Sequence, residues 1–276
     1  MRASSHETAR LAIHELTEDK FRRNPRKVVA LLRAASERGD PEANFGLGYL
    51  YETGLGVLRN PRRAFRCYLK AAEDGHPDAA HNVATLYQVG EGVRASSKEA
   101  FRWFRKAAKL GSSASTIHAL GWCYRHGKGT KRNLATGYRL LRRAATRGFA
   151  EAQFSVGVCF SRGEGVKQDR RGAFKWFMKA AMQGHDDAMY NVAFFYENGK
   201  GVKRDIRKAA AWYRAAAATG LCDAQYALGR LYEEGLNGRS NLRAALAWYS
   251  KATHCEDKRV SRNASTAIKD LRNRKK

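Results

Sequence analysis

Long apolar runs are missing from this chain of 276 residues. A helix that crosses a membrane needs about 20 consecutive apolar residues, and every apolar stretch here is far shorter. Residues 1–23 also lack the apolar core of a secretion signal, and their acidic side chains argue against an organelle transit peptide. The sequence therefore predicts a cytoplasmic protein without a membrane span.

Proline is scarce, with four residues, and no segment is rich in glycine and serine. Segments of that kind mark linkers between domains, so nothing in the composition divides the chain. Hydrophobic residues make up 43% of the sequence, which is enough for a continuous core. We expect one domain.

Acidic residues are in the minority: 26 stand against 52 basic residues, which gives a formal net charge of +26. A basic protein of this kind attracts anionic surfaces through its overall field. The charge therefore raises the question of an acidic partner, whether an acidic protein or a nucleic acid.

Cysteines are few and show no paired spacing; they are Cys67, Cys123, Cys159, Cys222 and Cys255. An odd count of this kind predicts reduced thiols. Cys123 and Cys159 occupy equivalent positions in neighbouring repeats, described next, so we expect them about 9–10 Å apart. That separation exceeds the roughly 7 Å between Cα atoms that a disulfide allows.

What the sequence does have is a repeat. Trp176, Trp212 and Trp248 recur every 36 residues, and Trp103 precedes Trp176 by two periods plus one inserted residue. The extra residue lies between Gly111 and Tyr124. A fixed period in this range is typical of solenoids.

Each repeat predicts two helices around a glycine turn. In residues 186–221 an apolar stripe indicates the first helix, and Gly199 and Gly201 then supply the positive φ angles of a tight helix ending. A short polar residue opens each second helix, where its side chain can accept from unpaired N–H groups. These predicted N-caps are Asn24, Asn60, Ser96, Asn133, Asp169, Asp205 and Asn241.

The predicted organisation is a single solenoid over residues 1–276. Residues 5–40 form a degenerate first repeat, in which Leu11 matches Leu47 but the turn glycines are missing. Six full repeats follow at 41–76, 77–112, 113–149, 150–185, 186–221 and 222–257. Residues 258–276 provide a closing helix and a basic tail.

The repeated pattern Ala-x-x-x-Val/Leu-Gly/Ala-x-x-Tyr-x-x-Gly-x-Gly-Val, followed by Lys-Ala-x-x-Trp-Tyr-x-x-Ala-Ala, resembles the Sel-one-like repeat family. This family is related to tetratricopeptide repeats, and the resemblance covers about residues 5–271. It implies an all-α fold, a right-handed superhelix of antiparallel helix pairs. It also implies a non-enzymatic scaffold or adaptor for multiprotein complexes. One branch of the family has cysteines that bridge the helices of each repeat, a spacing that we do not find here.

No motif proposes a reaction, a cofactor or a small-molecule substrate. The Gly-x-Gly turns follow helices and do not continue as phosphate-binding loops, so we interpret them as structural. His118, Cys123 and His126 raise the question of a metal site. However, His118 and Cys123 are about 140° apart on a helix, and a core cysteine is the favoured interpretation over a metal ligand. We therefore predict that the chain is not an enzyme.

By analogy with tetratricopeptide repeats, the first helices line a concave groove. Their outward positions form two ladders of aromatic and other residues across the repeats. The first ladder is Phe45, His81, His118, Phe154, Tyr190 and Tyr226, and the second is Tyr49, Thr85, Trp122, Val158, Phe194 and Arg230.

Two interpretations of this groove stay open. Either the aromatics anchor a peptide with basic residues, next to acids such as Glu42 and Glu197, or the first ladder packs between repeats. In the second case the acids at the helix starts only complement the helix dipole.

Basic residues at steps of four form a ridge along each second helix, opposite its apolar face. We expect these ridges on the convex side, where they could bind anions. The residues are Arg62, Arg66, Lys70, Lys98, Arg102, Lys106, Arg139, Arg143, Arg171, Lys175 and Lys179.

The ridge has no interleaved aromatics on which nucleic-acid bases could stack. The alternative to a functional ridge is a solvated outer face. The main hypothesis is therefore a scaffold that binds a protein in its groove, and the second is a basic solenoid that binds nucleic acid or another anionic surface.

Overall fold

The computed structural model describes residues 25–111, 113–236 and 239–273. Over those residues the chain forms fourteen α-helices and no β-strand, which confirms the predicted all-α repeat fold. None of the helices in the described ranges is long and apolar enough to cross a membrane.

The chain divides into two compact units, with the boundary after Leu140. Helices of unit 1 are α3 (Pro25–Glu37), α4 (Pro41–Thr53), α5 (Pro61–Glu73), α6 (Pro77–Val89), α7 (Ser97–Lys109) and α8 (Ala114–His126). Helix α9 (Leu134–Thr146) contains the boundary. Helices of unit 2 are α10 (Ala150–Arg162), α11 (Arg170–Ala181), α12 (Asp186–Asn198), α13 (Ile206–Ala218), α14 (Cys222–Glu234), α15 (Leu242–Ala252) and α16 (Lys258–Asn273).

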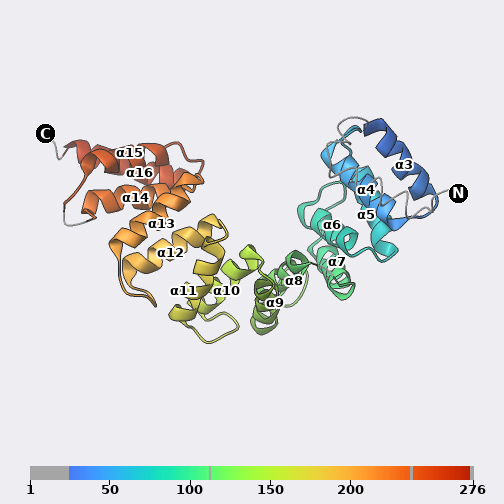
Figure 1. Cartoon of the computed structure of the whole chain (residues 1–276), viewed down its shortest axis with the longest axis horizontal. Helices are drawn as coiled ribbons and strands as arrows, with labels where there is room; N and C mark the ends of the chain where they lie inside the picture. Colours follow the sequence, from blue (N-terminus) through green and yellow to red (C-terminus); the bar gives the residue numbers. More distant parts are fainter. Residues whose placement is uncertain (1–24, 112, 237–238, 274–276) are drawn as a thin grey trace. The chain divides into compact units, whose positions relative to one another are not determined.

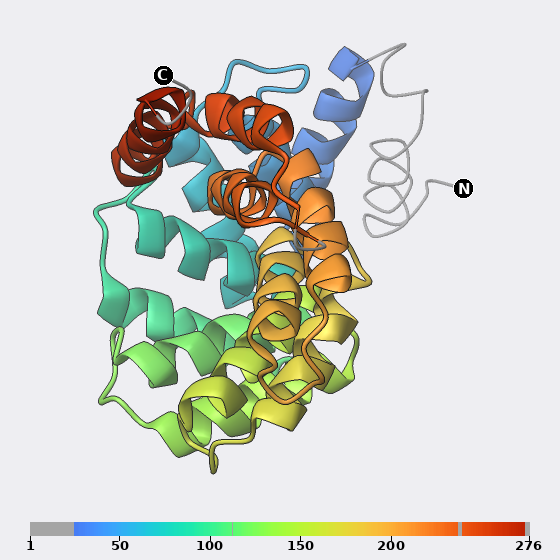
Figure 2. The ribbon, with the colours of Figure 1, turned by 90° about the vertical axis from the view of Figure 1, so that its left-hand side faces the viewer.

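Within each unit, helices that follow one another in sequence pack side by side, for example α4 with α5 and α12 with α13 (Figure 1). Figure 2 shows the same pairing from a second direction. Each pair is one repeat, so the even-numbered helices from α4 to α14 are first helices and the odd-numbered helices from α5 to α15 are second helices.

The second helices begin at the positions that their polar N-cap residues indicated in the sequence. Side-chain atoms of Asn60, Ser96, Asn133, Asp205 and Asn241 each accept from the backbone N–H three residues later, at 2.9–3.3 Å. Asp169 also precedes its helix, although its side chain makes no capping bond. Asn24 lies outside the described residues, as do Leu11, Asn237 and the tail residues Arg274, Lys275 and Lys276.

The glycine turns join the repeats as well as the helices. The first glycine of the turns that follow α4, α6, α8, α10 and α12 ends its helix in the left-handed conformation, as at Gly54 and Gly199. The second packs on the preceding repeat: a Cβ added at Gly129 would overlap the carbonyl oxygen of Ser97, and one at Gly92 would overlap that of Pro61. The first glycine of the motif is therefore needed for its positive φ angle. The second is needed both for its positive φ angle and because no Cβ fits beside the preceding repeat.

The core of each unit is a series of clusters between adjacent helices. In unit 1, Ala71, Ala72, Ala79 and Ala80 are completely buried with Tyr68 where α5 meets α6. In unit 2 the equivalent cluster between α13 and α14 buries Ala216, Ala217 and Ala224. Small side chains at these positions let the helix axes approach closely, while larger rings fill the space beside them.

The last helix closes unit 2. Val260, Ala264 and Leu271 of α16 are buried against Ala245, Tyr249 and Ala252 of α15. The predicted first-helix positions Val260 and Ala264 thus bury the apolar end of the final repeat.

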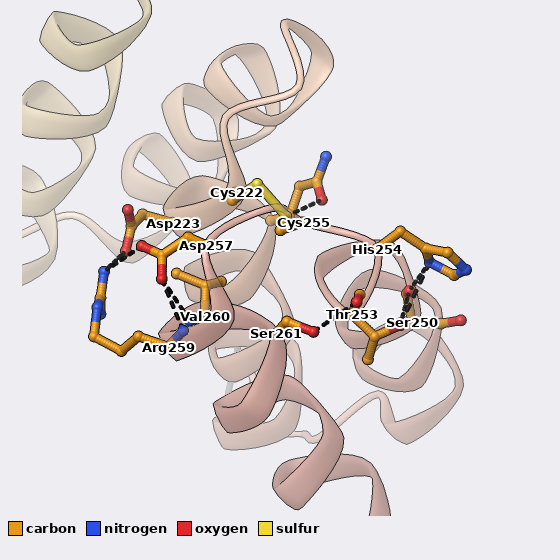
Figure 3. The surroundings of a disulfide bond; sticks show 11 residues. Cys222, Asp223, Ser250, Thr253, His254, Cys255, Asp257, Arg259, Val260 and Ser261 are labelled. Atoms are coloured by element: carbon orange, nitrogen blue, oxygen red, sulfur yellow. Dashed lines mark hydrogen bonds and ion pairs between the residues drawn. A yellow bond between two sulfur atoms is a disulfide. The ribbon is translucent and has the colours of Figure 1, made fainter.

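A disulfide joins Cys222 to Cys255, whose Cα atoms are 6.0 Å apart (Figure 3). The expectation of reduced thiols is wrong for this pair. Cys222 starts the first helix of the last repeat and Cys255 follows its second helix, so the antiparallel return of the chain brings them together. Cys67, Cys123 and Cys159 are free thiols.

The fold predicts a difference between two glycine substitutions. Gly129→Ala adds a Cβ that overlaps the Ser97 backbone, whereas Gly75→Ala meets nothing within 4 Å; both glycines have positive φ. We expect Gly75→Ala to lower the free energy of unfolding by about 1 kcal/mol and Gly129→Ala by about 3 kcal/mol. Urea unfolding of both variants measures the difference, and equal losses would contradict the close contact.

Candidate binding surfaces

The first ladder packs inside the repeats, and we call it the packing column (Phe45, His81, His118, Phe154, Tyr190, Tyr226). Five of its rings lie 5.3–5.7 Å, centroid to centroid, from a ring on the second helix of the same repeat. These pairs are Phe45–Tyr68, His81–Phe104, Phe154–Phe177, Tyr190–Tyr213 and Tyr226–Tyr249. The structure leaves His118 half-buried. Most of this ladder therefore serves the core, but within each repeat rather than between neighbouring repeats as the structural interpretation expected.

Two members of the packing column also hold the last residue of their own repeat, a histidine that caps the first helix of the next repeat. His76 stacks on Phe45 at 4.4 Å, and His185 stacks on Phe154 at 4.6 Å. The Nδ1 atom of each histidine accepts from a backbone N–H in the first turn of its helix. The sequence analysis did not find these caps, because it searched for short polar residues at the second helices only.

His81 and Tyr190 show how strongly this column is desolvated. Burial lowers the pKa of His81, whose ring also bonds to the Thr116 hydroxyl at 2.9 Å. Burial raises the pKa of Tyr190, and the nearby carboxylate of Asp223 adds to that rise. Both shifts disfavour the charged form, as expected for rings withdrawn from water.

The second ladder is more open, and we call it the open column (Tyr49, Thr85, Trp122, Val158, Phe194, Arg230). Tyr49 is 41% exposed, and Trp122 and Phe194 are half-buried. The ring of Trp122 lies 4.6 Å from that of His126, and the amine of Lys200 lies 4.3 Å from the centre of the Phe194 ring. Of these three rings, Tyr49 is therefore the most exposed, while Trp122 and Phe194 are half-buried like the rings of the packing column.

A hollow of about 230 Å³ lies beside Trp122 in unit 1. It is lined by Gln88, Ser97, Ala100, Trp122, Cys123 and Lys128. The hollow thus combines one face of an aromatic ring, an apolar floor and one cation at its edge.

The acids at the ends of the first helices bind buried tyrosines. The hydroxyls of Tyr68, Tyr213 and Tyr249 donate to Glu52, Glu197 and Glu233 at 2.6–2.8 Å. Where the second helix has Phe104, Leu141 or Phe177 instead, the acid is replaced by Gln88, Arg125 or Ser161. The two positions change together from repeat to repeat, which was a signal in the sequence that the analysis did not use.

The other acids of the groove are also engaged. Glu42 and Glu151 lie 3.4 and 3.0 Å from His76 and His185, and Asp223 pairs with Arg259 at 2.9 Å. Arg230 of the open column pairs with both Glu197 and Glu234. Glu42 and Glu151 thus pair within their own repeats, and Glu197 and Asp223 pair with side chains of the next segment, which weakens the hypothesis of an acidic groove for a basic peptide.

On the second helices, the third position of each ridge has a structural contact. Lys70 donates to the carbonyl of Ser36 at 3.2 Å, and Lys106 to that of Ala72 at 2.7 Å. Both carbonyls belong to the end of the preceding second helix, where a cation is favourable. Lys106 and Lys179 also lie over the Trp103 and Trp176 rings, at 4.8 and 4.4 Å.

The first two positions of the ridges are exposed and mostly unpaired. Arg102 pairs with Glu99 at 3.0 Å. In the described part of the chain, no ion pair or hydrogen bond engages the side chains of Arg62, Arg66, Lys98, Arg139, Arg143, Arg171 and Lys175. In addition, α9, α11, α13 and α15 contain no acidic residue.

A second hollow, of about 400 Å³, lies beside α7 in unit 1. Its lining is Glu99, Arg102, Trp103, Arg105, Lys106 and Lys109. Four cations and one carboxylate therefore surround an indole ring in this hollow.

The proposed metal ligands do not come together as a site. Over the described ranges, no group of three or more His, Cys, Asp or Glu side chains is placed to hold a metal ion. Cys123 is buried, and its burial raises the pKa of the thiol to about 11, as expected for a core cysteine.

The sequence profile of the Sel1 repeat matches residues 41–76, 77–112, 114–149, 150–185, 186–221 and 222–257. The chain belongs to the Sel1 repeat family. These boundaries confirm the six predicted repeats and leave residue 113 as the insertion in the third. Sel1 repeats are generally a non-catalytic scaffold fold that mediates protein interactions.

Solved structures agree with this assignment. A Sel1 repeat protein from Oxalobacter formigenes is 29% identical, with a TM-score of 0.81 over 91% of this chain and 98% of that chain. The protein c5321, a protective antigen of uropathogenic Escherichia coli with this fold, is 28% identical, with a TM-score of 0.81. The match covers 97% of this chain but only 57% of c5321. No curated protein sequence matches the chain.

The tyrosine–carboxylate pairs predict a loss of stability in alkali. Burial, strengthened by the adjacent carboxylate, raises the pKa of Tyr68, Tyr213 and Tyr249. Unfolding lets these phenols ionise above pH about 10, so each lowers the free energy of unfolding by about 1.4 kcal/mol at pH 11. Urea unfolding at pH 9 and pH 11 should show a smaller loss in Tyr213→Phe than in the wild type. An identical loss in both would show that this phenol ionises in the folded state.

Proposed function

We propose that this chain is a non-enzymatic scaffold that binds a protein partner on the face formed by its first helices. The observation that carries the proposal is the division of the two ladders. The packing column is occupied by internal contacts, whereas in the open column Tyr49 is exposed and Trp122 is half-buried beside a hollow. Accessible aromatic rings next to a hollow are typical of binding hot spots.

The hollow at Trp122 supports a particular kind of ligand. Its volume of about 230 Å³ accommodates one apolar side chain, and the Lys128 amine at its edge favours an acidic neighbour. The acids Glu52, Glu197 and Glu233 are used by buried tyrosines. The proposed ligand is therefore a peptide segment with an apolar anchor and an acidic residue close by, rather than the basic peptide of the first interpretation of the groove.

A peptide-display library selected against the purified chain tests this function. Binding of the selected peptides should weaken by about 30-fold in Trp122→Ala, because a hot-spot ring contributes about 2 kcal/mol. The control is the double variant Arg62→Glu, Arg66→Glu, whose changes lie on a second helix. It should leave the affinity for the peptide unchanged. Fluorescence anisotropy of a labelled peptide gives both constants.

Two results would contradict the proposal. Peptides that bind Trp122→Ala as tightly as the wild type would exclude the hollow. Peptides that lose affinity only in the Arg62→Glu, Arg66→Glu variant would move the binding surface to the ridge. Circular dichroism of each variant checks that the helices are intact.

A second candidate function is binding of a polyanion, such as a nucleic acid, by the second helices. The unpaired cations Arg62, Arg66 and Lys98 and the hollow beside α7 favour it. Since Trp103 is the only aromatic in that hollow and lies under Lys106, contacts would be to phosphates and not to bases. The binding would then be independent of sequence and strongly dependent on salt.

Salt titration separates this candidate from the first. If six phosphates are engaged, the log–log slope of affinity for single-stranded RNA against salt should be about −4, and Arg62→Glu with Arg66→Glu should reduce its magnitude by about 1.4. Arg94→Glu with Lys131→Glu carries the same charge change on the turns and is the matched control. A slope near zero, or equal effects of the two double variants, would reject a dedicated ridge site.

A further inference from the structure

The disulfide lies at a corner where three helices of unit 2 meet. Cys222 is the first residue of α14, and Cys255 belongs to the short linker between α15 and α16 (Figure 3). The bond spans a sequence separation of 33 residues, which is nearly the whole of the last repeat, residues 222–257. It therefore fixes the two ends of one helix pair to each other.

Charged and polar contacts gather at the same corner. Arg259 at the start of α16 pairs with Asp223, next to Cys222, at 2.9 Å, and with Asp257 at 3.4 Å. The hydroxyl of Ser261 donates to the carbonyl of Thr253 at 2.7 Å. Figure 3 shows these links on the side of the linker that faces α16. The ion pairs are exposed, and such pairs contribute little on their own, so the covalent bond is the main link at this corner.

Both half-cystines are only half-buried, whereas the free thiols of Cys123 and Cys159 are buried. A small thiol can therefore reach the Cys222–Cys255 bond without unfolding the core. Formation of the bond takes two thiols to one disulfide with release of two protons and two electrons. A disulfide oxidant, such as oxidised glutathione or a thiol–disulfide oxidoreductase, accepts those electrons and becomes a dithiol.

We propose that Cys222 and Cys255 form a redox-sensitive lock on the C-terminal repeat, and that the chain works in an oxidising compartment. In the oxidised state the last repeat and α16 form a closed end to unit 2. In the reduced state the link between the start of α14 and the α15–α16 linker is lost, and the end opens more often. Disulfides persist in oxidising compartments and are reduced in the cytoplasm, so this proposal replaces the cytoplasmic location expected from the missing signals.

The disulfide should change the equilibrium constant between the closed and the open end of unit 2 by a definite factor. Closing a loop of 33 residues in the open state removes chain entropy, which corresponds to a change on the order of 100-fold in the opening equilibrium. The effect is confined to this end of unit 2, where α16 buries Val260, Ala264 and Leu271 against α15, while α14 is also held by its packing against α13. Nothing in this proposal depends on which surface binds a partner.

Hydrogen exchange of the purified full chain tests the lock. Dithiothreitol should raise the exchange rate of amides in α14 and α16 by on the order of 100-fold and leave α4 and α5 unchanged. Cys222→Ser with Cys255→Ser should show the fast rate with or without the reductant. Cys67→Ser, which removes a free thiol, should respond to the reductant as the wild type does.

Thiol alkylation under denaturing conditions, followed by mass spectrometry, tests the redox state in the cells that naturally make the protein. We expect Cys67, Cys123 and Cys159 to be alkylated and the other two cysteines to be protected until reduction. Alkylation of all five would overturn the proposed compartment. Exchange rates that do not change on reduction of the bond would overturn the lock, whatever the compartment.

Discussion

The contact on which the structure depends is the burial of one helix pair against the next. Ala79, Ala80 and Ala216 are fully buried at these contacts, and the backbones approach so closely at Gly129 that no Cβ fits. A single pair of thirteen-residue helices cannot bury its apolar face alone, so each repeat is stable only beside its neighbours. The rings of the second helices then need partners, and the packing column supplies them.

Local features of this fold could be predicted from the sequence, since they depend on residues a few positions apart. Asn60 and Asp205 cap their helices, and Gly199 adopts positive φ, for reasons contained within one turn. The side of the first helix that faces outward could not be predicted in the same way. Phe45 and Tyr49 differ by one helical turn, and only the crossing of α4 with α5 places the first against Tyr68 and leaves the second exposed.

Contacts between the two helices of one repeat were also not predicted from the sequence, although two of them left a trace in it. The Tyr213–Glu197 pair recurs in some repeats and is lost at both positions in others, as in the change to Phe177 and Ser161. Cys222 and Cys255 were treated as unpaired because only equivalent positions of neighbouring repeats were compared. An antiparallel helix pair instead brings together the first and last residues of one repeat.

The first and second helices of the repeats carry different charges. This difference helps to separate charged residues with structural contacts from those that are candidates for binding. α4, α6 and α12 contain no lysine or arginine, while α9, α11, α13 and α15 contain no acid. Acids of the first helices hold tyrosines and histidines, and the lysines at 70 and 106 hold carbonyls of the preceding repeat. The exposed rings of the open column and the unpaired arginines of the ridges have no such structural role, so they are where binding is expected.

The assignment of the packing column to the core is tested most directly by a double-mutant cycle on Phe154 and Phe177, whose rings lie 5.7 Å apart. The free energies of unfolding of Phe154→Leu, Phe177→Leu and the double variant give the coupling between the two rings. We predict a coupling of about 0.5–1.5 kcal/mol, as for other aromatic pairs in contact. A coupling of zero would contradict the account and return Phe154 and its column to the binding surface.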